Sequence, residues 1–175
     1  MGNNVKRTNN MDRDKNFGHR RSIRLHGYDY SSVGCYFITI CTQHRICILG
    51  RVQQGVMVLN EIGQMVDKWI RELDANISYI RIPSYVVMPN HLHFIIQIEN
   101  DTSVTVGDVV QRFKAFSTNE YINNVKCLAW QPFDKRVWQR NYYEHIIRNQ
   151  ESYDMIAEYI ANNPINWTKD KFYAS

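Results

Sequence analysis

The residues His91 and His93 are the first feature of the sequence whose types and spacing suggest chemistry. His91 directly precedes a largely apolar run, residues 92–98, and His93 lies within it. The run follows Pro89-Asn90, a pair typical of tight turns. Side chains alternate along a strand, so both imidazoles share one face, roughly 6–7 Å apart at their backbones. Two ring nitrogens at that spacing can bind one metal ion, each at ~2.0–2.2 Å. The competing interpretation is a pair of polar side chains on the wetter face of a half-buried strand.

Tyr159 and Asn163 are the second feature, four residues apart and therefore neighbours on one face of a predicted helix. A hard divalent ion accepts imidazole nitrogen and amide oxygen, so the two histidines and Asn163 can supply three ligands and leave positions open for a substrate. The Tyr159 phenol would lie beside those positions. A phenol, with a reference pKa of ~10, is a poor nucleophile at neutral pH unless a metal-bound phosphodiester assists it. Alternatively, Tyr159 is a rim residue packed against the sheet.

The hydrophobic pattern predicts the elements that position these residues. Strands are predicted at 34–41, 77–82, 85–88 and 92–98, with a final strand inside 137–147 and a short strand or hairpin arm at 52–58. Helices are predicted at 59–73, at 108–121, and from the cap Asn149 to about Asn163. Strands joined by hairpins, with helices packed on the sheet, indicate an α+β sandwich.

The composition fits a soluble globular chain, and its mildly basic charge permits a polyanionic partner without requiring one. The length of 175 residues suits a single domain, which we expect to span residues 20–175, preceded by a loosely held polar arm at 1–19. Net charge is +4, and 13% of the residues are aromatic. Four cysteines without paired CxxC spacing indicate reduced thiols. We expect a cytoplasmic protein without a membrane span or signal peptide.

Several basic and aromatic residues are candidates for contacts with nucleic acid, because aromatic rings stack on unpaired bases and cations bind phosphates. One group interleaves both types near the predicted final strand, and two further groups are basic. The candidates are Trp138, Arg140, Tyr142, Tyr143, His145 and Arg148, then Arg112 and Lys114, then Arg20, Arg21 and Arg24. For the basic groups, a merely solvated helix face or arm is the alternative.

Three stretches together resemble the HUH single-tyrosine transposases, and most closely the REP-associated tyrosine transposases. His91-Leu92-His93, within Met-Pro-Asn-His-Leu-His-Phe, resembles their HUH motif. Residues 138–149 resemble the stretch before their catalytic helix, and Glu158-Tyr159-Ile160-Ala161-Asn162-Asn163-Pro164 resembles the segment that carries the nucleophile. The start of these proteins is similar to residues 20–47, and the resemblance covers most of residues 20–167.

The resemblance implies a ferredoxin-like sandwich with a central antiparallel sheet. It implies that His91, His93 and Asn163 bind Mg²⁺ or Mn²⁺ and that Tyr159 attacks single-stranded or hairpin DNA to form a 5′-phosphotyrosine. Such a reaction conserves bond energy, which agrees with the lack of a P-loop signature. Relatives include both monomers and homodimers.

Two other functions compete with the transposase interpretation. One is a hairpin DNA-binding module that does not cleave, and the other is a metal phosphodiesterase that uses water. The rival tyrosines Tyr142 and Tyr143 precede the predicted helix and lack the four-residue link to Asn163.

Overall fold

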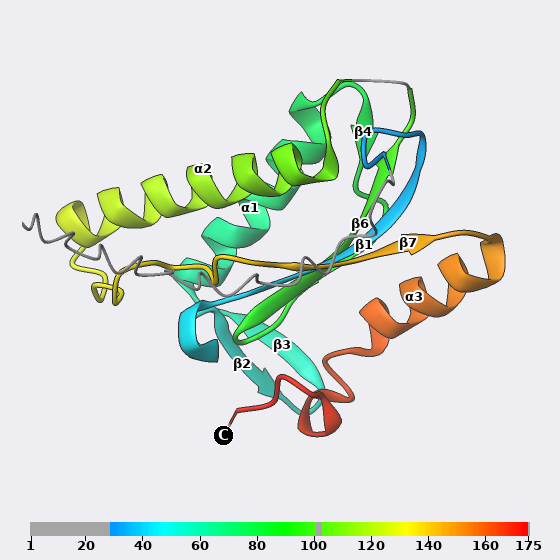
Figure 1. The fold of residues 1–175 in the computed structure, drawn as a ribbon. Coiled ribbons are helices and arrows are strands. Elements are labelled where there is room, and N and C mark those ends of the chain that lie inside the picture. The colour runs from blue at the N-terminus through cyan, green and yellow to red at the C-terminus, as the bar shows by residue number, and fades with distance from the viewer. Residues whose placement is uncertain (1–28, 101–102, 175) are drawn as a thin grey trace, which may run out of the picture.

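The computed structural model of the chain describes residues 29–100 and 103–174. The predicted arm at 1–19 and the basic residues Arg20, Arg21 and Arg24 lie outside these ranges. Figure 1 shows a twisted sheet with two helices on one face and a third helix on the other. The predicted α+β sandwich with a central antiparallel sheet is thereby confirmed.

In the described part of the chain, the main sheet has five strands. They are β1 (Gly34–Cys41), β4 (Ile80–Arg81), β5 (Tyr85–Val87), β6 (His91–Ile98) and β7 (Tyr143–Ile147). The order is β4-β6-β1-β7, β5 also pairs with β6, and every pairing is antiparallel. The long strands β1 and β6 are almost entirely buried, as their continuous apolar and aromatic sequences require. A separate hairpin joins β2 (Gly50–Gln53) to β3 (Val56–Leu59).

The helices divide between the two faces of the sheet. Helices α1 (Glu61–Asn76) and α2 (Val106–Cys127) cover one face of the sheet. The even-numbered residues of β6, from Leu92 to Ile98, point to that face and form part of the main core. Helix α3 (Gln150–Asn162) covers part of the other face, where Ile160 meets Ile95. Two 3₁₀ turns, η1 (Gln43–Arg45) and η2 (Trp167–Lys169), complete the elements. The face occupied by α3 is also the face to which His91 and His93 point.

Most predicted elements are present, and their ends differ for local reasons. Helix α2 starts earlier than predicted because Thr105 and Asp108 form a capping box. Asn149 caps α3 through the amide of Ser152, as predicted, and Asn60 caps α1 through the amide of Gly63. The strand predicted at 77–82 shortens to β4, and the final strand begins only at Tyr143.

All four cysteines are free thiols. Among the described residues, no helix combines the length and the apolar character that crossing a bilayer requires.

Candidate active site

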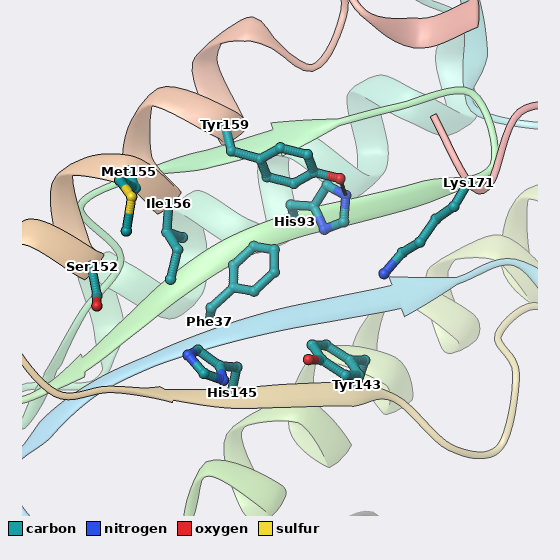
Figure 2. A pocket seen from close by; sticks show the side chains of 9 residues that line it. All are labelled: Phe37, His93, Tyr143, His145, Ser152, Met155, Ile156, Tyr159 and Lys171. Carbon is teal, nitrogen blue, oxygen red and sulfur yellow. Dashed lines mark hydrogen bonds between the residues drawn. The ribbon is translucent and has the colours of Figure 1, made fainter. Parts of the chain in front are cut away.

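Strand pairing fixes the orientation of His93. Thr39 of β1 lies directly across from His93 of β6, and its hydroxyl oxygen is 2.7 Å from His93 Nδ1. Both side chains are buried. A hydrogen bond at Nδ1 holds the ring so that Nε2 faces the α3 side of the sheet, where the Tyr159 hydroxyl lies 3.3 Å away. Figure 2 shows this contact between the tyrosine on α3 and the histidine on β6.

The turn before β6 fixes His91 in a similar way. The Asn90 carboxamide nitrogen donates to the carbonyls of Arg45 and Phe172, at 3.1 and 2.8 Å. Its oxygen therefore faces His91 Nδ1 at 2.9 Å and accepts a hydrogen bond from it. His91 consequently carries its proton on Nδ1, which leaves a lone pair on Nε2. That atom is buried and has no hydrogen-bond partner.

Helix α3 brings Tyr159 and Asn163 to the histidines. Ile160, between them in sequence, is anchored in the small core under the helix. Asn163 is the C-cap residue and keeps helical backbone angles (φ −59°, ψ −43°), so the one-turn relation to Tyr159 holds. The Asn163 side chain is buried, and its Oδ1 has no hydrogen-bond partner. Tyr159 is 41% exposed, so its phenol can be reached from solvent.

Asp170, just after η2, is a member of the site that the sequence did not indicate. Its Oδ2 accepts hydrogen bonds from the Tyr159 hydroxyl at 3.2 Å and from Asn163 Nδ2 at 3.1 Å. Its Oδ1 accepts from the backbone amide of Phe172 at 2.6 Å. The Phe172 ring packs against that of His91, with centroids 4.7 Å apart. The C-terminal segment thus completes the site from the side opposite the sheet.

Burial sets the protonation states in the site. It lowers the pKa of His91 to about 4, with partial opposition from the Asp170 carboxylate, and holds the pKa of His93 well below its ordinary value. Both imidazoles are therefore neutral at pH 7, as metal ligands must be. Burial, and then the Asp170 charge, raises the pKa of Tyr159 to about 12. The phenol is consequently protonated at neutral pH in this arrangement.

The donor set fits a divalent metal ion. The candidate ligand atoms of His91, His93 and Asp170 lie within 4.8 Å of one another. His91 Nε2 and Asn163 Oδ1 are buried without partners, a costly state that a bound cation would relieve. Two neutral nitrogens, an amide oxygen and one carboxylate form a mixed set that suits Mn²⁺ and accepts Mg²⁺. Thr39 and Asn90 supply the outer hydrogen bonds that metal-binding histidines require.

Among the residues predicted to bind DNA, Tyr143 and His145 lie beside the site. Both are exposed on β7 and line the same hollow as Tyr159 and His93 (Figure 2). Arg148 is exposed where β7 ends and α3 is about to begin. Arg140 is exposed in the loop before β7. The structure therefore groups part of the predicted interface around Tyr159.

The other predicted residues that the structure describes are Trp138, Lys114, Tyr142 and Arg112, and they contact the main core or lie on α2. Trp138 is buried in the main core, where its indole N–H donates to the Ser117 hydroxyl at 2.9 Å. Lys114 of α2 donates to three carbonyls of the loop at 139–141 and lies over the ring of Tyr142. Arg112 is exposed on the same helix, next to α1. Arg112 and Lys114 therefore lie on the helix that covers the face opposite α3, whereas Tyr142 lines a small hollow together with Thr39 and Phe172.

Several residues of the site carried no sequence signal. Asp170 and Phe172 lie in the stretch 168–175, which has no hydrophobic period and no motif. Asn90 was interpreted only as a turn former. The pairing of β1 with β6 could have indicated Thr39, since it follows from the strand register.

Buried neutral imidazoles, a tyrosine and a cluster of oxygen donors lie together on one face of an α+β sandwich, in an arrangement that could hold a divalent metal ion. Comparison with known proteins gives the family. The model of the family "Transposase IS200 like" matches residues 35–163, which include both histidines, Tyr159 and Asn163. The chain belongs to this family of transposases.

Two relatives illustrate the range of similarity. An uncharacterized protein of Haemophilus influenzae (strain ATCC 51907 / DSM 11121 / KW20 / Rd) is 42% identical, with 89% of this chain and 93% of that protein covered. The structure of a REP-associated tyrosine transposase bound to a REP hairpin superposes with a TM-score of 0.58 at 21% identity. That alignment covers 82% of this chain and 74% of the other. The second likeness supports the fold.

Proposed function

We propose that this protein is a metal-dependent transesterase that cleaves and rejoins single-stranded DNA at hairpin or palindromic sequences through a 5′-phosphotyrosine on Tyr159. The observation that carries the proposal is the convergence of Tyr159 with His93, Asn163 and Asp170 around two buried donor atoms without partners. The family supports DNA transposition as the process. The relative bound to a REP hairpin supports hairpin DNA as the substrate.

In the proposed reaction, the Tyr159 oxygen forms a bond to phosphorus while the bond from phosphorus to the 3′ oxygen breaks. The proton lost by the phenol is balanced by the proton that the released 3′ oxygen gains. A bound Mg²⁺ or Mn²⁺, held by His91, His93 and Asn163 with Asp170 as a further donor, would stabilise negative charge on the phosphate. A later attack by a 3′-hydroxyl on the phosphotyrosine rejoins a strand and restores the phenol.

The chain's own contacts help a phenol that is a poor nucleophile on its own. Helix α3 carries both Tyr159 and Asn163, so one packing interaction positions nucleophile and ligand together. The hydrogen bonds to His93 and Asp170 restrict the hydroxyl to the side of the site where the buried donors converge. Positioning of this kind replaces part of the activation that the raised pKa removes.

The proposal is tested by incubating the protein with labelled hairpin DNA and Mg²⁺ or Mn²⁺ and resolving the products under denaturing conditions. We expect a covalent protein–DNA adduct that maps to Tyr159 by peptide mass spectrometry. Tyr159→Phe should abolish both the adduct and cleavage, whereas the matched variants Tyr142→Phe and Tyr143→Phe should retain them. Cleavage without an adduct would indicate attack by water. Hairpin binding without cleavage would indicate a recognition module.

A further inference from the structure

A hollow of about 350 Å³ lies directly beside Tyr159. Its floor is the sheet, where the buried Phe37 of β1 and the exposed Tyr143 of β7 line it, and its wall is α3, from Ser152 to Tyr159. Figure 2 shows these side chains around one open space, with the Lys171 amine reaching in from the C-terminal segment. The volume lies at the lower end of the range for sites that bind small ligands.

The hollow exists because α3 covers only part of its face of the sheet. Tyr143, His145 and Ile147 alternate along β7 and therefore point to the same side. Ile147 is buried under α3, but Tyr143 and His145 remain exposed at the edge of the sheet. Tyr143 keeps 46% of its surface accessible. The exposed ring is therefore available to a ligand.

The lining combines rings with a cation. The Lys171 amine lies 5.2 Å from the centre of the Tyr143 ring. The Phe37 ring meets that of Tyr159 edge to face, with centroids 6.1 Å apart. Flat aromatic surfaces beside a cation are the features by which proteins bind unpaired nucleotides, since every base offers a π-face and every phosphate a charge.

A second hollow, of about 490 Å³, lies on the other side of Tyr159. Residues of polar type line it, including Lys169, Asn166 and Asp170, and it shares Tyr159 and Lys171 with the aromatic hollow. The two spaces therefore adjoin at the candidate nucleophile. A strand that places a phosphate at the Tyr159 hydroxyl can direct the attached base into the aromatic hollow while its sugar–phosphate chain continues along the polar one.

We propose that the aromatic hollow is a binding site for one unpaired nucleotide adjacent to the phosphate that Tyr159 attacks, with its base stacked on Tyr143 and its phosphate beside Lys171. This inference rests on the proposed function, because Tyr159 as nucleophile sets where the strand lies. The inference adds a pocket that binds an unpaired base by stacking. A base in a duplex is excluded, since a duplex cannot enter a hollow of this size. The preference for single strands then has a structural cause.

The test uses the full chain carrying Tyr159→Phe, so that no cleavage interferes, and a short oligothymidylate with one central 2-aminopurine. Stacking quenches the fluorescence of this base. We expect quenching on binding, and we expect Tyr143→Ala to remove the quenching and weaken binding by about 5-fold or more. Tyr143→Phe should retain both effects because stacking needs the ring and not the hydroxyl. Tyr173→Ala, which removes an aromatic ring of similar exposure outside the hollow, is the matched control.

An abasic site in place of 2-aminopurine gives a second measurement. It should weaken binding to the protein with Tyr143 intact and have little effect once Tyr143→Ala is present, because both changes remove the same stacking contact. Additive losses, or quenching that Tyr143→Ala leaves unchanged, would overturn the proposal. Absence of quenching at saturating protein would overturn it too, since stacking tolerates any sequence.

The two proposals can fail separately. Quenching that depends on Tyr143, without a covalent adduct in the active protein, would retain the nucleotide pocket and refute Tyr159 as nucleophile. An adduct on Tyr159, together with DNA binding that Tyr143→Ala leaves unchanged, would retain Tyr159 as nucleophile and refute the nucleotide pocket.

Discussion

The hydroxyl of Tyr159 donates a hydrogen bond to the carboxylate of Asp170, 3.2 Å away. Eleven positions separate the two residues, and the chain reverses between them so that the segment after α3 returns to the helix end. The same carboxylate oxygen also accepts from Asn163. Asp170 therefore connects the candidate nucleophile to a candidate ligand, and it brings the one negative charge of the donor set.

The first prediction concerns that charge. Asp170→Asn keeps the shape of the side chain but removes the carboxylate, so it should weaken Mn²⁺ binding by about 10-fold or more. The measurement is a titration followed by the electron paramagnetic resonance of free Mn²⁺, or by calorimetry. Asp154→Asn, on the exposed side of α3, should bind the ion as the unchanged protein does. Equal affinity in both variants would remove Asp170 from the donor set.

The second prediction concerns the residue that orients His93. Thr39→Val removes the hydroxyl that lies 2.7 Å from His93 Nδ1 while conserving the shape of the buried side chain. Metal affinity should fall by about 10-fold to 100-fold, and the free energy of unfolding should fall by about 1–3 kcal/mol because a buried nitrogen loses its partner. Thr39→Ser retains a hydroxyl and should recover most of both losses. If Thr39→Val bound metal normally, the outer hydrogen bond would have no influence on the ligand.

The third prediction is a pH dependence of stability in metal-free protein. Burial places the pKa of His91 at about 4, below the value of 6.5 for an unfolded chain, so between these values the unfolded state binds more protons. Stability should therefore decrease as the pH falls from 6.5 to 4, by about 3 kcal/mol for this residue alone. Urea denaturation at a series of pH values, with chelator present, measures it.

The matched variants for the pH series are His91→Gln and His145→Gln. His91→Gln removes one of two buried histidines with a lowered pKa, so it should reduce the slope over this range, and the buried His93 should account for the slope that remains. His145 is exposed, so His145→Gln should leave the curve unchanged. An identical slope in His91→Gln and in the unchanged protein would contradict the assignment of the effect to His91.

Local sequence patterns were enough to predict most of the fold. Alternation predicted which face of β6 carries His91 and His93, because a buried strand leaves little freedom in which side each residue takes. The caps Asn60 and Asn149 were predictable because a cap depends on residues within one turn. The four-residue spacing of Tyr159 and Asn163 also survives at the end of α3.

The missing parts depend on contacts between distant residues. Asp170 reaches the site through the return of the chain after α3, and no periodic pattern encodes that path. Trp138 shows the converse error of interpretation: its aromatic type suggested base stacking, but the bridge between Thr42 and Trp138 places it in the core. Composition cannot distinguish an aromatic ring that binds a base from one that fills a core.

Lys114 gives the last prediction, because the sequence and the structure suggest different roles for it. As a basic residue on a helix it was expected to contact phosphate, yet its amine donates to the carbonyls of Gln139, Arg140 and Asn141, and burial lowers its pKa to about 8. A residue that holds this loop should affect stability more than DNA binding. Lys114→Met should therefore lower the free energy of unfolding by about 1–3 kcal/mol, as measured with urea, since three carbonyls lose their donor.

DNA binding separates the two roles of Lys114. With a structural lysine, the slope of log affinity against log salt concentration stays as in the unchanged protein, whereas the loss of a phosphate contact reduces it by about one. Arg112→Gln on the same helix is the control for stability, because Arg112 is exposed and its change should cost no more than about 0.5 kcal/mol. If Lys114→Met reduced the slope of log affinity against log salt concentration by about one and left stability unaffected, the result would support the phosphate contact that the sequence suggested.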